Sequence, residues 1–442
     1  MIYLDYLCST ERIKAVISSL DEDYVAVSLA PAGDLVTLSP DAMHRMEQVA
    51  RMTGAAFVYS DYYDVTADGA LSLHPLIDCQ AGALRDDFDF GRILLIESRA
   101  LLNALGDIDR AYRFAAFYAL RLALSRQGAV IHINEPLYKV KARMADGSQF
   151  DYVDPRNREV QIEMERACTG HLKAVGAYLE PVAVSEDFSG VYPVEASVII
   201  PVRNRCSTVR DAVESALSQV TDFPFNVIIV DNHSTDGTTE VIRDIAGSDD
   251  RVIHLIPQED GLGIGGCWNM AVKSSFCGRF AVQLDSDDIY SGTGTLQRIV
   301  DCFRSLRCAM VVGSYTLTDF DCNVIPPGLI SHAEWTDDNG RNNALRINGF
   351  GAPRAFFTGI ARQYLFPDTS YGEDYAMCLA VSRAHKVGRI YDSLYLCRRW
   401  SGNSDAALSL EALNRNNTYK DRIRTWELHE RMRLNAARDE EM

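Results

Sequence analysis

The chain has 442 residues, 24% of them charged, and a formal net charge of −17. Such acidity makes duplex nucleic acid and anionic membranes poor default partners, and the length allows about two or three domains. No window approaches the roughly 18 uncharged apolar residues of a membrane span, and the sequence from Met1 shows no basic region followed by an apolar run, so no signal peptide is expected.

The eleven cysteines are scattered and include no C-x-x-C pair. This usage indicates reduced thiols rather than a disulfide scaffold or a zinc site. We therefore expect a cytoplasmic protein without nucleic-acid partners, attached at most peripherally to the inner face of the membrane. A homo-oligomer stays open.

Residues 1–145 alternate between strand and helix patterns. Ser39 and Pro40 are a typical cap and first turn of a helix. The predicted strands are Tyr24–Leu29, Ala55–Tyr59 and Gly128–Ile133, and the predicted helices are Asp41–Met52 and Ala111–Ser125.

Residues 146–192 are interpreted as a connector with a charged helix over Pro155–Leu179 and an acidic linker.

The pattern is stronger from Ala196 onward. Ser197–Ile200 and Asn226–Val230 are continuous apolar runs, typical of strands buried on both faces of a parallel sheet. Arg251–Ile256 and Phe280–Gln283 follow as further strands, with helical patterns between them. This alternation predicts a doubly wound, mostly parallel α/β sheet with right-handed crossovers.

After Asp288 the order changes. The expected elements are a strand at Ala309–Gly313, a long polar loop at Asp319–Asn348, a helix from Tyr371 to Ala384 and a short strand at Gly388–Tyr391. We predict one domain over residues 193–404 and a charged helical tail over residues 405–442.

The end of the fourth strand carries three carboxylates in four positions, Asp285-Ser-Asp287-Asp288. Open α/β sheets bind ligands at the carboxyl ends of their strands, and clustered carboxylates suit a divalent cation that holds a diphosphate. Taken alone, the same residues would also suit a solvated turn or a helix cap.

Several motifs together resemble the inverting glycosyltransferases of family 2, which have the GT-A fold. They occur in the family's order over roughly residues 195–400 and comprise SVIIPVRN at Ser197–Asn204, VDNHSTDG at Val230–Gly237, the glycine-rich turn at Asp260–Gly266 with Asn269, Asp285-Ser-Asp287, and Gly372-Glu-Asp374. The resemblance implies transfer of a sugar from a nucleotide-sugar, usually UDP-linked, with Mn²⁺ or Mg²⁺. A glycan or a lipid-linked molecule would be the acceptor.

The resemblance also assigns roles to residues. Asp285 would reach the ribose, Asp287 would ligate the metal together with Asp285, and Asp374, with Glu373 beside it, would be the general base. The nucleotide-sugar would be bound by Pro201, Arg203, Asp231, Asn232, Gly263, Asn269, Arg398 and Arg399.

Three positions depart from the family pattern. Asn232 stands where a second acid is frequent, and Leu396 replaces the Gln of the Gln-x-x-Arg-Trp motif, which argues against a processive synthase. Some members supply a late His as a metal ligand, where this chain has Trp400 and Ser401.

Structural alternatives stay open for several of these residues. Asp231 would also serve as a helix cap, Glu373 and Asp374 would favourably charge a helix N-terminus, and the glycines would simply make a turn. Arg398 and Arg399 would equally form structural ion pairs. Trp335 and Trp400 would form an acceptor platform or pack in the core.

An internal repeat is visible at nearly constant spacing. Phe117–Arg126 parallels Asp374–Arg383, and Ser28–Ala32 parallels Gln283–Asp287. Ala30, Ala32 and Phe117 would then stand at the positions of the metal acids and the base. Residues 1–145 are accordingly interpreted as a degenerate, non-catalytic partial GT-A-like domain, in which residues 61–64 would bind carbohydrate or only pack.

Two other function classes are alternatives to a glycosyltransferase. A sugar-nucleotide pyrophosphorylase shares this general sheet but should carry a Gly-rich basic loop after the first strand, where this chain has Pro201-Val-Arg-Asn-Arg-Cys. A non-catalytic carbohydrate-binding scaffold would not require three acids at Asp285, Asp287 and Asp374.

Overall fold

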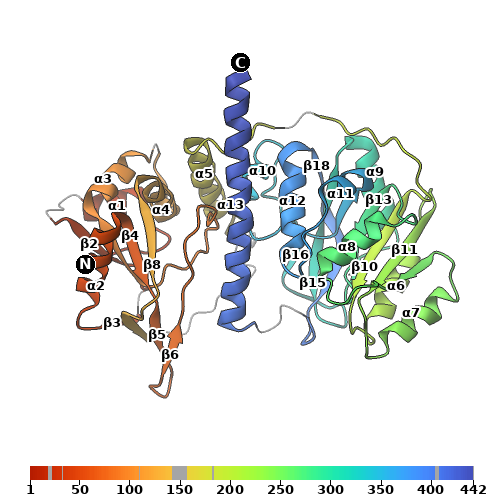
Figure 1. Ribbon diagram of the computed structural model, residues 1–442, viewed down its shortest axis with the longest axis horizontal. Helices are drawn as coiled ribbons and strands as arrows, with labels where there is room; N and C mark the ends of the chain where they lie inside the picture. Colours follow the sequence, from red (N-terminus) through yellow and green to blue (C-terminus); the bar gives the residue numbers. More distant parts are fainter. Residues whose placement is uncertain are drawn as a thin grey trace. The chain divides into compact units, whose positions relative to one another are not determined.

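The computed structural model describes residues 1–17, 22–31, 33–108, 110–141, 157–181, 184–403 and 408–441. The chain forms two compact units (Figure 1). The first unit comprises residues 1–179, 345–347 and 408–442, and the second unit comprises residues 180–344 and 348–407. Ala32 and much of the predicted connector, residues 142–156, lie outside the described residues.

The second unit is built on a sheet whose central strands are parallel. β10 (Ala196–Val202) lies between β11 (Phe225–Asp231) and β13 (Phe280–Gln283), and β12 (Val252–Leu255) pairs with β11 at the edge. The crossovers contain α6 (Val209–Leu217), α7 (Thr238–Ala246) and α8 (Ile264–Lys273). The predicted mostly parallel α/β sheet is confirmed, because apolar runs buried on both faces form its centre.

The remaining strands of this sheet are mixed in direction. β17 (Arg354–Phe357) is antiparallel to both β13 and β15 (Met310–Thr318), and β18 (Val387–Arg398) runs parallel to β15 and pairs with β14 (Ile289–Tyr290). This half contains, among other helices, α9 (Thr295–Leu306), α11 (Thr358–Tyr364) and α12 (Glu373–Ala384).

Two predictions for this half were wrong. The loop expected at Asp319–Asn348 contains β16 (Val324–Ile330) and α10 (Gly340–Asn343), and the strand expected at Gly388–Tyr391 continues to Arg398. In both cases a backbone partner decides the outcome, since β16 and β18 hydrogen-bond to β15.

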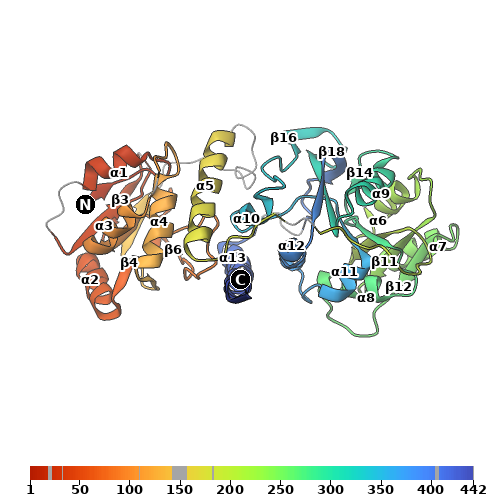
Figure 2. The same cartoon turned by 90° about the horizontal axis from the view of Figure 1, so that it is seen from above.

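The first unit has a sheet of its own, with the order β1 (Ile2–Tyr3), β2 (Tyr24–Ser28), β7 (Ile93–Glu97), β4 (Ala55–Ser60) and β8 (Ala129–Ile133). Among its helices, α2 (Ala42–Thr53) contacts β4 and β7, while α4 (Ala116–Gln127) contacts β4, β8, α1 (Thr10–Ile17) and α3 (Ser98–Gly106) (Figure 2). A second small sheet has the order β3 (Leu35–Leu38), β9 (Tyr138–Lys141), β5 (Tyr62–Val65) and β6 (Leu71–His74).

The two large sheets share strand order and direction over four strands. β2-β7-β4-β8 in the first unit corresponds to β13-β17-β15-β18 in the second. In each set the first two neighbouring pairs are antiparallel and the last is parallel.

Asp61 and Tyr62 lie inside the first unit rather than on its surface. The Asp61 carboxylate accepts a hydrogen bond from the amide of Leu76 and lies 2.7 Å from Nε2 of His132. The Tyr62 ring stacks between His74 and Tyr138. A carbohydrate-binding surface at these two residues is thus contradicted, because both side chains are buried.

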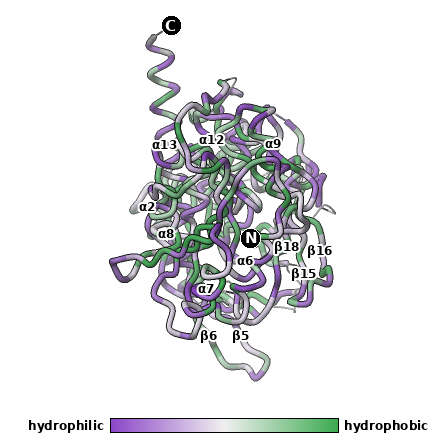
Figure 3. Tube along the Cα trace, turned by 90° about the vertical axis from the view of Figure 1, so that its right-hand side faces the viewer, coloured by the Kyte–Doolittle hydropathy of each residue, from purple (hydrophilic) through white to green (hydrophobic). Residues whose placement is uncertain are grey.

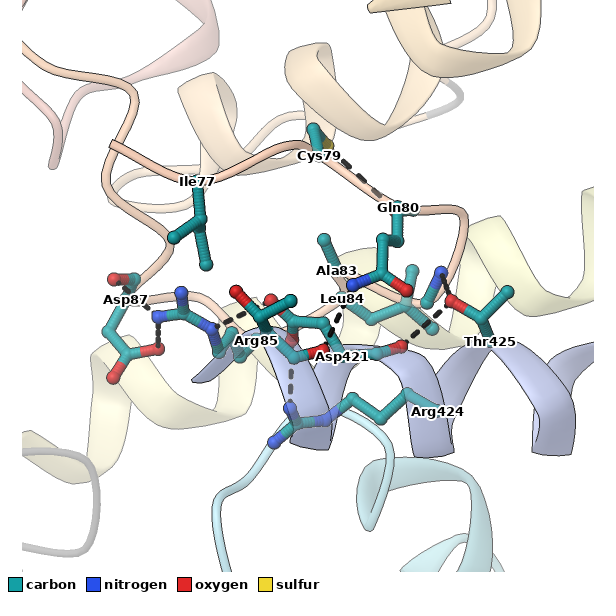
Figure 4. Close-up of polar contacts among 12 residues, drawn as sticks. Ile77, Cys79, Gln80, Ala83, Leu84, Arg85, Asp87, Asp421, Arg424 and Thr425 are labelled. Carbon is teal, nitrogen blue, oxygen red and sulfur yellow. Dashed lines mark hydrogen bonds and ion pairs between the residues drawn. The ribbon is translucent and has the colours of Figure 1, made fainter. Parts of the chain in front are cut away.

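The C-terminal helix α13 (Leu410–Glu441) packs within the first unit, as does α5 (Arg158–Ala174). Figure 4 shows the contact of α13 with the segment around Arg85: the Gly82 amide donates to Thr425 Oγ1, and Asp421 lies between Arg85 and Arg424. Hydrophilic and hydrophobic residues alternate along the free end of α13 (Figure 3). No helix within the described ranges is long and apolar enough to cross a membrane.

Candidate active site

A cleft of about 480 Å³ lies at the carboxyl ends of β10, β11 and β13 in the second unit. This is the edge at which open α/β sheets bind ligands. The structure brings eight of the sequence-predicted residues to its wall: Pro201, Arg203, Asn232, Asp285, Asp287, Glu373, Asp374 and Arg399.

Carboxylates crowd the end of the cleft that follows β13. Burial raises the pKa of Asp285, and the neighbouring Asp287 carboxylate raises it further. Burial, together with Asp285 and Asp287, also raises the pKa of Asp288. A divalent cation would relieve this repulsion, and carboxylate oxygens are the ligands that Mg²⁺ and Mn²⁺ accept.

Asp285 and Asp287 therefore fit part of a cation site, because they would supply only some of the ligands that the cation needs. No group of three or more His, Cys, Asp or Glu side chains that could hold a metal occurs in the described part of the chain. The protein would supply two carboxylates, and the other ligands would come from a diphosphate and water, as Mg²⁺ commonly arranges with nucleotide substrates.

Two neutral donors and one guanidinium group surround the Asp287 carboxylate. Asn403 Nδ2 lies 3.2 Å and Trp400 Nε1 lies 3.4 Å from Asp287 Oδ2, and Arg205 Nε is 3.8 Å away. Trp400 thus contacts the acid at the place where some family members have a His. Trp335 is buried away from this cleft and packs against Phe350.

The predicted base lies at the start of α12, on another wall of the cleft. Gly372 has φ +76°, which glycine adopts without strain, and it turns the chain into the helix. Asp374 Oδ2 is 3.0 Å from Arg354 Nη1, and the Asp374 side chain is 30% exposed. Burial by itself would lower the pKa of Arg354, but the Asp374 carboxylate raises this pKa above its ordinary value. The guanidinium therefore stays charged beside Asp374.

Glu373 differs from its neighbour because it is 8% exposed and its Oε2 has no hydrogen-bond partner among the described residues. Burial, followed by repulsion from Asp374, raises its pKa from 4.5 to about 8. Glu373 is therefore mostly protonated at neutral pH, whereas a general base must be able to accept a proton. This favours Asp374 for that role.

Glu373 should make the free energy of unfolding depend on pH. Its pKa is higher in the folded protein, so the folded state holds more protons between pH 4.5 and about pH 8, and stability falls as pH rises through this window. Glu373→Gln should remove this fall, a change in slope of at most about 1.4 kcal/mol per pH unit. Urea titrations of both proteins at several pH values check this, and parallel stability curves would contradict it.

Pro201, Arg203 and Asn232, which are predicted to contact the nucleotide, lie together on the cleft wall. Asn232 Nδ2 donates to the carbonyl of Leu262, while its buried Oδ1 has no partner among the described residues. That oxygen is free to accept a hydrogen bond from a ligand.

Asp231 is fully buried and is not on the cleft wall. Its oxygens accept hydrogen bonds from the Ser234 amide and the Thr239 hydroxyl. Burial by itself would raise the pKa of Asp231, but these hydrogen bonds lower it below its ordinary value. The structure therefore uses Asp231 to hold the turn after β11, and it brings the adjacent Asn232 to the cleft instead.

Three further predicted contacts are satisfied inside the protein. The Gly263 amide donates to Asp368 Oδ1, and Asn269 exchanges two hydrogen bonds with the backbone of Phe366. Arg398 is 3% exposed and donates to Asp211 and to the carbonyl of Asp287. None of the three lines the cleft, and each is held by neighbouring groups inside the protein.

The glycine-rich turn makes room for backbone rather than for phosphate. A Cβ added to Gly265 would lie 1.8 Å from the carbonyl oxygen of Pro367, and one added to Gly263 would lie 2.4 Å from Thr369. Because a backbone oxygen cannot easily move aside, the segment 367–369 and the start of α8 fit closely only with glycine.

Gly265→Ala should lower the free energy of unfolding by about 1–3 kcal/mol, the typical cost of overpacking. Gly292→Ala is the matched control, since a Cβ there meets nothing within 4 Å, and it should change stability by less than about 0.5 kcal/mol. Urea denaturation of the two variants measures the difference. Equal stabilities would show that the segment 367–369 can shift.

The residues on the cleft wall that the sequence analysis missed include Arg205, Trp268, Arg354 and Asn403. Arg205 follows the first motif by one position, so the same strand end could have indicated it. Arg354 carried no signal, because β17 was not predicted and its place beside Asp374 depends on pairing with β13 and β15.

Part of the chain is similar to known glycosyltransferases. The profile of "Glycosyl transferase family 2" matches residues 197–365, which include the strand ends with Asn232, Asp285 and Asp287 but not Asp374. The putative teichuronic acid biosynthesis glycosyltransferase TuaG of Bacillus subtilis is 29% identical over 149 residues, 34% of this chain and 58% of that protein. Chondroitin synthase of Pasteurella multocida is 32% identical over 151 residues, 33% of this chain and 15% of that protein.

Solved structures overlap with part of the chain. TarS residues 1–349 of S. aureus in complex with UDP-GlcNAc align with a TM-score of 0.40 and 18% identity, over 52% of this chain and 70% of that one. The mannosyltransferase PcManGT of Pyrobaculum calidifontis in complex with GDP-Man and Mn²⁺ aligns with a TM-score of 0.38 and 15% identity, over 64% of this chain and 85% of that one. Residues 197–365 of the chain are therefore similar to glycosyl transferase family 2.

Proposed function

We propose that this protein is a metal-dependent, inverting glycosyltransferase. It would move a sugar from a nucleotide-sugar, UDP-linked as the family resemblance implies, to a hydroxyl of a glycan or lipid-linked acceptor. The observation that carries the proposal is one cleft that holds Asp285 and Asp287 on one wall and Asp374 on another.

The residues divide the chemistry between them. Asp285 and Asp287 would hold Mn²⁺ or Mg²⁺, which supplies positive charge for the leaving diphosphate. Arg203, Arg205 and Arg399 also line the cleft, and guanidinium groups suit phosphate oxygens.

Asp374 would take the proton from the acceptor hydroxyl as that oxygen attacks the anomeric carbon. The bond from this carbon to the diphosphate breaks in the same displacement, which inverts the configuration. Arg354 would position the carboxylate through the ion pair at 3.0 Å. General-base catalysis of this kind typically contributes about 10²–10⁴-fold.

Asp287→Asn is expected to reduce metal-dependent turnover at least tenfold. The test is a screen of UDP-glucose, UDP-galactose, UDP-GlcNAc and GDP-mannose for Mn²⁺-dependent hydrolysis by the full chain. Asp301→Asn is the matched control, because Asp301 is exposed on α9. Hydrolysis that survives Asp287→Asn would refute the metal site, and nucleotide binding without any turnover would instead favour a non-catalytic carbohydrate-binding protein.

We further propose that the first unit has no catalytic role. The position that matches Asp374 in the internal repeat is Phe117, which is fully buried and packs against the Tyr6 ring, and the position that matches Asp285 is Ala30. The unit would therefore provide neither a base nor a metal ligand. An Asp374→Asn variant should consequently have no second source of turnover.

A further inference from the structure

The first unit contains a cavity of about 560 Å³ to which the proposed transferase function assigns no role. Residues of α4, α5 and α13, the starts of β4 and β8, and the segment from Cys79 to Leu84 form its wall. Its size is within the range of about 300–1,000 Å³ that is usual for small-molecule sites.

Most of the wall is apolar. Aromatic and aliphatic side chains come from strand, helix and loop alike: Phe57, Leu84, Phe90, Leu122, Val130 and Leu428. His429 and Met432 of α13 are exposed and lie on the rim. A ligand in this cavity would therefore gain from having an apolar body.

The charged groups on the wall all have the same sign. Among the described residues that line the cavity, the ionisable ones include Arg121 and Arg126 but no Asp or Glu. This is unusual in a chain with a net charge of −17, and it favours an anion over a neutral or cationic ligand.

Arg121 is held by neutral groups. It is 4% exposed, and its terminal nitrogens donate to the carbonyls of Ala83 at 3.0 Å and of Arg85 at 2.6 Å. The Phe90 and Tyr118 rings face the guanidinium, and its Nε has no partner among the described residues. A buried guanidinium without a directly paired carboxylate is costly unless an anion approaches it.

Arg126 and His171 lie on the same wall. Arg126 is paired with Asp107 at 3.3 Å and reaches to 3.2 Å from His171 Nδ1. Burial and the two arginines lower the pKa of His171 to about 3. The imidazole is therefore neutral, and the cationic character of the wall comes from the arginines.

We propose that this cavity binds an amphipathic organic anion, an apolar chain whose carboxylate or phosphate head is held by Arg121. The apolar wall would take the chain, and the buried guanidinium would take the head group, since charge-assisted hydrogen bonds to guanidinium are strong. The proposal does not depend on glycosyl transfer. It concerns a site in the unit for which we propose no catalysis.

The test is isothermal titration calorimetry of the full chain with decanoate, decyl phosphate and the uncharged decanol. At least one of the two anions should bind at least tenfold more tightly than decanol. The stronger anion identifies the carboxylate or the phosphate as the preferred head group. Failure of both anions to bind at millimolar concentration, or equal binding of decanol, would overturn the proposal.

Two variants locate the site. Ala129→Trp should fill the cavity and weaken anion binding at least tenfold, whereas Ala70→Trp, at an exposed turn elsewhere in the same unit, should leave it unchanged. Arg121→Gln should weaken anion binding at least tenfold and leave decanol binding unchanged. If that variant does not fold, Arg126→Gln tests the charge of the same wall. Unchanged anion binding in Ala129→Trp would place the ligand elsewhere and refute the site.

Discussion

Replacing Asp374 with Asn is expected to lower kcat by about 10²–10⁴-fold, the range typical of a lost general base. The amide has nearly the same shape as the carboxylate but cannot accept the proton of the acceptor hydroxyl. Affinity for the nucleotide-sugar should change little, because the proposed donor contacts come from Arg203, Asn232, Asp285 and Asp287 on other walls of the cleft. The measurement is steady-state release of nucleotide with the donor found in the screen, together with donor binding by calorimetry.

Glu373→Gln is the matched control for this prediction. Glu373 lies next to Asp374 on α12 but is buried, and its pKa is raised to about 8. The substitution therefore replaces one neutral donor with another near neutral pH and should cost less than tenfold in kcat. If Glu373→Gln removes activity while Asp374→Asn retains it, the base is Glu373 and the assignment is wrong.

Asp421→Ala is expected to lower the free energy of unfolding of the first unit by about 3–5 kcal/mol, the usual cost of breaking a buried ion pair. Asp421 and Arg424 are fully buried, and the carboxylate lies 2.9 Å from Arg424 Nη1 and 3.4 Å from Arg85 Nε. The variant removes the carboxylate that both guanidinium groups contact. The two guanidinium charges stay buried after the substitution, whereas truncating an apolar side chain would leave only a cavity.

Urea denaturation of the full chain measures this effect. Glu411→Ala is the control, because Glu411 lies exposed in the first turn of the same helix, and it should cost less than about 1 kcal/mol. A loss of similar size in both variants would mean that α13 contributes little to the stability of the unit.

The sequence predicted the centre of the second unit well. Ser197–Ile200 and Asn226–Val230 are apolar at every position, which only a strand buried on both faces accommodates, and both lie in the middle of the parallel sheet. Asp285 and Asp287, which follow the fourth predicted strand of this unit, also lie on the cleft wall as expected. Strand ends of a parallel sheet share one edge, so a local pattern was enough to place them.

Short antiparallel strands could not be predicted from the sequence. β17 has four residues and β7 has five, and each is inserted between strands that are distant in sequence. Their pairing is decided by neighbours in space, because periodicity over four or five residues does not distinguish a strand from a buried helical segment. The position of Arg354 beside Asp374 depends on this pairing.

The sequence by itself determined the α/β class, the order of the motifs and the carboxylates that lie on the cleft wall, because these features are local and repeat where strands end. Only the tertiary structure decided which polar residues of those motifs face the cleft. Asp231, Gly263, Asn269 and Arg398 are satisfied by neighbours inside the protein, while Asn232 and Arg354 are brought to the cleft. The physical reason is that a buried polar group must find a partner, and the identity of that partner depends on segments far away in the sequence.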